Sequence, residues 1–349
     1  MMKEIGSEFH WFEESTHIKG NGIENIEKHC KDFSYTFSGR TAYETIINDM
    51  PTKHNVLLPS YCCESMIIPF KKAGYAINFY SVVWDNGLKI DFNIPFSCDV
   101  LVLCNYFGFN YNYPDKPLYD FQRQGGIIIE DITHSLFSAT PSSYPDADYF
   151  IASLRKWDAL ISGGFCGKKS GTFILKPTQN IGKQYIEYKE RAMHSKAKYL
   201  ENKDLNYKIQ FMDLFSKSNE LLANGYSNTK IDNWSFERVK SWNISDMRKK
   251  RISNATILYD GLYGSTNISM MFSKKNMDSP LFVPVIIPKD KRSIIKEALI
   301  NNQIYCPIHW PKPNYKCNSL LYDMELSIVC DQRYNEQDML KIVDVLRKV

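Results

Sequence analysis

Two hydrophobic spacings alternate in the first half of the chain. The i, i+3, i+4, i+7 spacing of a single buried helical face predicts a helix over 41–50. Short apolar runs predict strands, and the three isoleucines before Glu130 and Asp131 are typical of a strand buried on both faces. The predicted strands are 55–58, 76–82, 99–105, 127–130, 148–153 and 171–176, with further helices near 63–73 and 115–124. This alternation between residues 38 and 176 indicates a doubly wound α/β sheet.

The second half of the chain has a different pattern. Residues 178–264 have the spacing of long helices with polar faces, interrupted by a turn-rich segment at 224–233. The C-terminal part mixes strands (282–287, 303–306, 326–330) with a helix near 290–301 and a final helix capped by Asn335. We therefore predict an N-terminal arm (1–35), a large domain (36–230) and a small C-terminal α+β domain (231–349).

Composition narrows the class of protein. Of the 349 residues, 44% are hydrophobic and 23% charged, which is typical of a globular chain, and apolar stretches such as 282–288 are too short to cross a bilayer. The N-terminus lacks the apolar core of a signal peptide, so we expect a cytoplasmic protein whose nine cysteines are reduced thiols. No paired C-x-x-C spacing indicates a metal site, so we expect no metal. A net charge of +4 gives little support for nucleic-acid binding.

Ser38 and Gly39 precede the first periodic residue of helix 41–50. The first backbone N–H groups of a helix have no partner within the helix, and together with the helix dipole they form a site for an anion such as phosphate. The alternative is an ordinary capped helix that binds nothing.

Two further side chains follow predicted strands. Asp131 lies at the carboxyl end of strand 127–130, where α/β sheets bind ligands, although it could equally cap the next turn. Lys156 comes just past strand 148–153, where partial burial would favour the neutral amine that Schiff-base chemistry needs. The alternative is a surface lysine beside Arg155.

Taken together, a phosphate cradle, a carboxylate and a Schiff-base lysine are the parts that hold pyridoxal phosphate. The carboxylate keeps the pyridine nitrogen protonated, which makes the ring an electron sink. Ser153 lies three residues before the lysine and could reach the phosphate, and His134 lies three residues after Asp131 and could contact the ring.

At this point the sequence resembles the fold-type I pyridoxal-phosphate enzymes, and among them the DegT/DnrJ/EryC1/StrS aminotransferases. The resemblance spans residues 38–349 and is weak between about 178 and 280. The 25-residue interval from Asp131 to Lys156 (156 − 131) is its specific part. The supporting segments are SGRTA (38–42), 56–75, NYFGF (105–109), IIIEDITHSL (127–136), SLRKW (153–157), SGG (162–164), YCPIHWP (305–311) and the C-terminal segment from Ser327.

The resemblance implies a large, mostly parallel, seven-stranded sheet sandwiched by helices, with a small C-terminal α+β domain. It also implies roles for single residues. Lys156 resembles the Schiff-base lysine, Asp131 the partner of the pyridinium, and His134 the residue that lies against the cofactor. The residues that resemble the neighbours of the phosphate are Gly39, Arg40, Thr41 and Ser153.

Some positions depart from the family pattern. The family places a ring-stacking aromatic residue shortly after the PS pair, whereas Tyr61 is followed here by Cys62 and Cys63. The interval between Ser153 and Lys156 is shorter than in many members. LNYK (205–208) only loosely matches a motif that reaches the partner subunit's phosphate.

Other readings of the same residues remain open. Residues 153–156 also fit the S-x-x-K signature of penicillin-binding proteins, but the companion motifs of those enzymes are missing. The same scaffold supports lyases, dehydratases and desulfurases, although the resemblance implies that its dehydratases have histidine in place of the lysine. A third possibility is a protein that binds the cofactor without turnover.

We expect an aminotransferase that moves an amino group from glutamate or a similar donor to a keto acceptor. The resemblance implies a keto sugar, commonly nucleotide-linked, on the way to a polysaccharide or natural product, and a homodimer. Aromatic residues at 106–113 and 309–310 could line the acceptor pocket.

Overall fold

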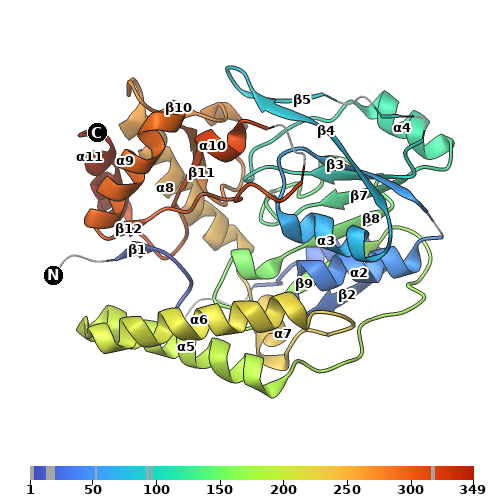
Figure 1. Cartoon of the computed structure of the whole chain (residues 1–349), viewed down its shortest axis with the longest axis horizontal. Coiled ribbons are helices and arrows are strands. Elements are labelled where there is room, and N and C mark those ends of the chain that lie inside the picture. Colours follow the sequence, from blue (N-terminus) through green and yellow to red (C-terminus); the bar gives the residue numbers. More distant parts are fainter. Residues whose placement is uncertain (1–3, 13–19, 52, 92–93, 96, 316–318) are drawn as a thin grey trace. The chain divides into compact units, whose positions relative to one another are not determined.

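The computed structural model describes residues 4–12, 20–51, 53–91, 94–95, 97–315 and 319–349 (Figure 1). Two compact units are formed from alternating pieces of the chain. Unit 1 comprises Met1–Ser7, Thr52–Asp148 and Ser245–Val349, and unit 2 comprises Glu8–Pro51 and Tyr149–Ile244. No described helix has both the length and the apolar composition of a membrane span.

The fold class predicted from the sequence is confirmed, because the chain has one large sheet flanked by helices. The strand order is β2-β9-β8-β7-β6-β3-β4-β5. The strands are β2 (Asp32–Thr36), β3 (Asn55–Pro59), β4 (Ala76–Trp84), β5 (Leu88–Asp91), β6 (Val100–Cys104), β7 (Ile127–Asp131), β8 (Tyr149–Ala152) and β9 (Gly164–Lys168).

Unit 1 contains five of these strands. β3 pairs in parallel with β4 and with β6, and β6 pairs in parallel with β7. All five residues of β6 are buried, as expected for a continuous apolar run in a sheet covered on both faces. The helices α3 (Glu64–Lys72) and α4 (Asp115–Arg123) lie close to their predicted positions.

The sheet has eight strands rather than the predicted seven, because β5 adds an antiparallel edge to β4. The chain reverses between them through Asn86 and Gly87, both with positive φ (52° and 147°). An Asn-Gly pair between extended segments is a strong hairpin signal.

The rest of unit 1 is a smaller α+β layer built from the C-terminal part of the chain. A three-stranded antiparallel sheet has the order β10-β11-β13. The final helix begins at the predicted cap, where Asn335 and Asp338 form a reciprocal capping box. The elements are β1 (Ile5–Gly6), α8 (Ile244–Leu262), β10 (Ser269–Met270), β11 (Val283–Ile286), α9 (Lys289–Asn301), β12 (Ile304–Tyr305), α10 (Leu321–Met324), β13 (Glu325–Ile328) and α11 (Glu336–Leu346).

Unit 2 contains the antiparallel trio β2-β9-β8. The strand predicted at 171–176 is wrong, since the chain there has no regular structure and the strand is β9, at 164–168. β9 carries two glycines in five residues, so its composition gave a weak strand signal. The helices are α1 (Glu24–Glu27), α2 (Gly39–Asp49), α5 (Lys183–Asn202), α6 (Leu205–Asn224) and α7 (Asn233–Lys240).

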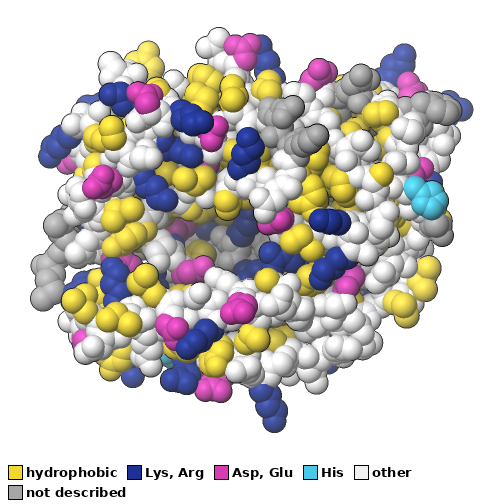
Figure 2. Space-filling model, in the orientation of Figure 1, with side chains coloured by type: hydrophobic (Ala, Val, Ile, Leu, Met, Phe, Trp, Pro, Cys, Tyr) yellow, Lys and Arg dark blue, Asp and Glu magenta, His cyan; other side chains and the backbone are white. Residues whose placement is uncertain are grey.

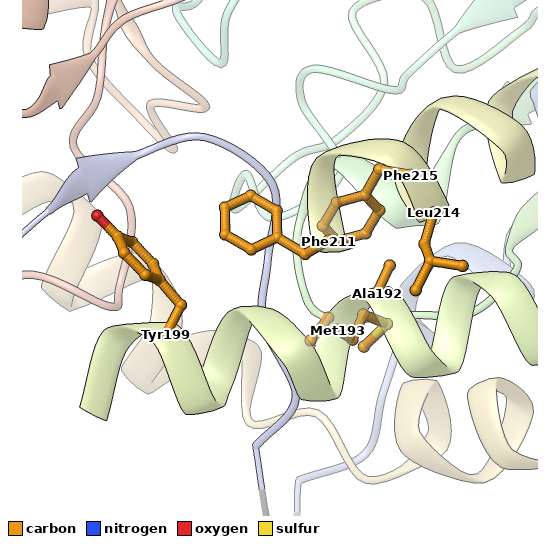
Figure 3. Packing of buried hydrophobic residues seen from close by; sticks show 7 residues of the cluster. Ala192, Met193, Tyr199, Phe211, Leu214 and Phe215 are labelled. Atoms are coloured by element: carbon orange, nitrogen blue, oxygen red, sulfur yellow. The ribbon is translucent and has the colours of Figure 1, made fainter. Parts of the chain in front are cut away.

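The long helices α5 and α6 run side by side in unit 2 (Figure 1). Figure 3 shows their shared core, in which Ala192, Met193 and Tyr199 from α5 meet Phe211, Leu214 and Phe215 from α6. Lys189 and Lys196, on the same helix α5, are also buried, at 6% and 1% exposure. The ammonium group of Lys189 lies 3.6 Å from a carboxylate oxygen of Glu8, and the Lys196 ammonium donates to the backbone carbonyl of Glu8.

Charge on the drawn face of the molecule is mixed. Lys and Arg side chains are interspersed with Asp and Glu side chains over the surface in Figure 2. This mixture agrees with the small net charge of +4.

Candidate functional site

The end of β7 in unit 1 carries the two adjacent carboxylates. Glu130 is fully buried and accepts hydrogen bonds from the Asn105 amide (2.9 Å), from the Ser143 backbone N–H (2.6 Å) and from the Ser142 hydroxyl. Burial raises the pKa of Glu130, and these donors oppose that rise. Glu130 therefore ties the segment after β7 to the sheet.

Asp131 closes β7 and is 6% exposed. Successive residues of a strand point to opposite faces, so Asp131 and Glu130 face different sides of the sheet. One oxygen of Asp131 accepts a hydrogen bond from the Thr133 backbone N–H (2.9 Å). This bond fixes the carboxylate at the carboxyl end of the strand, which is the position expected for a ligand-facing anion.

His134 lies in the turn that follows and is 1% exposed. Its Nδ1 accepts a hydrogen bond from the Phe107 backbone N–H (3.1 Å), and its Nε2 lies 3.0 Å from Nε2 of His309. The indole ring of Trp310 stacks on the imidazole, with centroids 5.2 Å apart. Both ring nitrogens thus have partners inside unit 1.

Two of the aromatic residues predicted to line an acceptor pocket, Phe107 and Trp310, lie near this histidine, with ring centroids 5.1 and 5.2 Å from its imidazole. Tyr61 is fully buried, with its ring 4.7 Å from Trp310 and 6.1 Å from Tyr106. Cys63, the other candidate for ring stacking, is half-buried at the start of α3, and its thiol lies 2.7 Å from the Ser65 hydroxyl. The structure places Tyr61 among its aromatic neighbours and Cys63 at a helix start.

Glu325 was not predicted as a site residue. It is fully buried at the first position of β13 and accepts hydrogen bonds from the His309 backbone N–H (2.9 Å) and the Ser327 hydroxyl (2.5 Å). Burial raises its pKa to about 7. Sequence reasoning missed it because a glutamate at the start of a strand carries no sign of burial.

The predicted phosphate cradle in unit 2 is the N-terminus of α2. Ser38 is the N-cap, and its hydroxyl accepts a hydrogen bond from the Thr41 backbone N–H (3.3 Å). Thr41 is buried, and its hydroxyl donates to the carbonyl of Tyr226 (2.8 Å). Arg40 is half-buried in the first turn of the helix.

Ser153 and Lys156 follow β8 in the same unit. Ser153 precedes a short 3-10 turn, Leu154–Lys156, which ends at the lysine. Lys156 is half-buried. A Cβ built on Gly39 would lie 3.4 Å from Cβ of Ser153, so the structure brings Ser153 to the start of α2.

Metal ligands are not grouped in the part of the chain that the structure describes. No three His, Cys, Asp or Glu side chains come together there as a possible metal site. The eight cysteines of the described residues are all free thiols.

Comparison with known proteins rests on the fold. No protein-family model matches the sequence, and no curated protein matches it either. Solved structures do match. The Helicobacter pylori aminotransferase PseC, involved in the biosynthesis of pseudoaminic acid, superposes with a TM-score of 0.65 over 99% of each chain at 12% identity. The chain has the fold of the sugar aminotransferases.

Two further structures place the chain on the same scaffold. The putative sugar aminotransferase Spr1654 from Streptococcus pneumoniae, in its PLP form, has a TM-score of 0.64 at 12% identity over 96% of this chain and 92% of its own. The E. coli GDP-4-keto-6-deoxy-D-mannose-3-dehydratase, with bound hydrated PLP, has a TM-score of 0.63 at 14% identity over 93% and 90%. The predicted resemblance is thereby confirmed at the level of the fold.

Proposed function

We propose that the protein is a pyridoxal-phosphate-dependent aminotransferase that moves an amino group from an amino acid, in our proposal glutamate, to the keto group of a sugar. One observation carries the proposal. Lys156 ends a single 3-10 turn that starts beside Ser153, and Ser153 faces the N-terminus of α2. The turn that carries Lys156 thus begins next to the start of α2, which supports a lysine and a phosphate cradle that act together in unit 2.

The residues of the cradle fit a phosphate group. Helix α2 has 11 residues, enough for a dipole whose positive end lies at Gly39. Gly39 has no side chain, and a Cβ there would contact Ser153 at 3.4 Å, so a larger residue would fill the gap between the start of the helix and Ser153. Backbone N–H groups and a serine hydroxyl are the donors that proteins use for phosphate.

The chain's own groups have distinct tasks in this proposal. Lys156 would hold the cofactor through its amine and would move a proton to and from the substrate carbon. Asp131 would keep a proton on the pyridine nitrogen, and the N-terminus of α2 with Ser153 would hold the phosphate. When bound, pyridoxal phosphate supplies an electron sink that stabilises negative charge at the substrate carbon.

Lys156 favours amino transfer over dehydration. A dehydratase is among the solved structures that share the fold, so the fold alone does not separate the two reactions. The resemblance implies histidine at this position in the dehydratases, whereas this chain has lysine. We further propose a homodimer that works in the cytoplasm on a nucleotide-linked sugar bound for a polysaccharide or natural product.

The first test is an absorbance spectrum of the purified protein with added pyridoxal phosphate. We expect a visible band from the lysine-bound cofactor, its loss with excess glutamate, and its absence in Lys156→Ala. Lys183→Ala, a change of an exposed lysine at the start of α5, is the matched control and should keep the band.

Three results would count against the proposal. The absence of any visible band in the wild type would show that the protein does not bind pyridoxal phosphate through a lysine. A band that persists with every amino donor would favour a lyase or a protein that binds the cofactor without turnover. Equal spectra for Lys156→Ala and Lys183→Ala would show that Lys156 does not attach the cofactor.

A further inference from the structure

His134 and His309 form a pair within unit 1 although 175 residues separate them in the sequence. Their Nε2 atoms are 3.0 Å apart, and their rings are perpendicular with centroids 4.6 Å apart. Two imidazole nitrogens at this distance form a hydrogen bond only when one of them carries a proton and the other does not. The pair therefore constrains the protonation of both rings.

We infer that His309 is a positioning residue, which fixes the tautomer and the ring orientation of His134. The backbone N–H of Phe107 donates to Nδ1 of His134 (3.1 Å), which favours an unprotonated nitrogen there, and an acceptor at Nε2 adds to this preference. A neutral His134 then carries its proton on Nε2 and donates it to Nε2 of His309. A proton on Nδ1 of His134 would oppose the Phe107 N–H.

The ring of His309 is itself held in place. The backbone N–H of His309 donates to the buried carboxyl of Glu325 (2.9 Å), which anchors the segment that carries the ring. The Phe107 ring packs against the imidazole of His309 with a centroid distance of 5.0 Å, and the Phe282 ring does so at 5.4 Å. An acceptor held on several sides can orient its donor.

His134 is oriented by stacking as well as by hydrogen bonds. Trp310, the residue after His309, lies nearly parallel to its ring at an angle of 20°. The segment 309–310 thus supplies both the ring that accepts the proton of His134 and the ring that covers one of its faces. This arrangement gives His134 a single ring position and a single tautomer.

The consequence for amino transfer rests on the proposed function and on the role that the resemblance implies for His134, namely a residue that lies against the cofactor. A ring that rotates or changes tautomer would alter that contact from one molecule to the next. Residues that orient a directly contacting group typically change activity by about tenfold to a hundredfold when removed, as measured around metal ligands. The tautomer itself can be measured without any cofactor.

The test compares His309→Gln with His309→Leu. The amide oxygen of glutamine can accept the Nε2 proton of His134, whereas leucine cannot. In 15N-histidine NMR spectra of the full chain, with the His134 signals identified by their loss in His134→Gln, we expect the Nε2-protonated tautomer in the wild type and in His309→Gln. In His309→Leu we expect a mixture of tautomers.

Kinetics provide the second measurement. We expect the rate of the glutamate half-reaction to fall about tenfold in His309→Leu and to stay within about twofold of the wild type in His309→Gln. A wild-type His134 protonated at Nδ1, or an unchanged tautomer in His309→Leu, would overturn the inference. Failure of the proposed function would appear differently, as a missing cofactor band with the tautomer result intact.

Discussion

Glu325 is a fully buried carboxyl whose side chain accepts hydrogen bonds from neutral groups. Its hydrogen bonds come from a backbone N–H and a hydroxyl, and the hydroxyl of the buried Tyr61 lies beside it. These groups do not offset the loss of water around a negative charge, so the pKa is raised to about 7. The same carboxyl anchors His309, so its charge affects a residue of the proposed site.

We predict that Glu325 makes the protein less stable as the pH rises from about 4.5 to about 7. In this window the folded state keeps a proton that the unfolded state has lost, so the free energy of unfolding falls. The total change is roughly 3 kcal/mol by the usual conversion of pKa shifts. In Glu325→Gln this contribution should be missing, so the variant gains stability relative to the wild type between pH 5 and pH 8.

Urea unfolding at pH 5 and at pH 8 measures the difference in the free energy of unfolding between Glu325→Gln and the wild type. Glu297→Gln, at an exposed carboxyl of α9, is the matched control and should follow the wild type. A constant difference between Glu325→Gln and the wild type at both pH values would show that the carboxyl is charged in the folded state throughout.

At the scale of elements, the start of α2 depends on two glycines with different tasks. A Cβ on Gly164 of β9 would lie 2.4 Å from the backbone carbonyl of Ser38, so this glycine lets β9 approach the helix cap. A Cβ on Gly39 would meet Ser153 at 3.4 Å, an ordinary contact distance. One glycine is required for packing and the other leaves space at the proposed phosphate cradle.

The two alanine variants should therefore separate stability from cofactor binding. We predict that Gly164→Ala lowers the free energy of unfolding by about 1–3 kcal/mol, because the backbone of Ser38 has to move. Gly39→Ala should keep the stability of the wild type, since alanine is the better helix former, but weaken the binding of pyridoxal phosphate. Denaturant unfolding and a titration followed by absorbance measure the two effects, and unchanged affinity in Gly39→Ala would contradict the cradle.

At the scale of the whole molecule, the exposed face of α6 bears on the proposed homodimer. Leu205, Ile209 and Met212 follow one another at i, i+4, i+7 and are 66%, 69% and 59% exposed. A row of exposed apolar side chains is costly in water unless another surface covers it. A second copy of the chain is the partner that the proposed homodimer supplies.

We predict that the protein sediments as a species of twice the 40.6 kDa chain mass. Ile209→Glu should shift it toward the single chain by placing a charge in the contact. Ile294→Glu, the same change at an isoleucine of α9 that is 53% exposed, is the control and should leave the mass unchanged. A wild-type monomer at micromolar concentration would rule out the homodimer. A stable dimer in Ile209→Glu would show that the contact does not involve this face of α6.

The sequence predicted correctly those elements whose signal lies within the element itself. The apolar run of β6, the stripe of α2 and the cap at Asn335 are local signals, and each element lies where it was predicted. It failed at β9, where glycines replace the apolar residues that mark a strand. The pairing of His134 with His309 and the burial of Glu325 arise from contacts between distant segments, which no local pattern contains.

The parallel pairing of β1 with β12 joins Ile5 to Ile304, nearly the full length of the chain apart. On a ribosome, which releases the N-terminus first, Ile5 must therefore wait for its partner until 299 further residues (304 − 5) have been made. The pieces of unit 2 end at Ile244, so its internal contacts do not depend on any residue after that position. All the pieces of unit 2 are thus made before β12, whereas those of unit 1 are not.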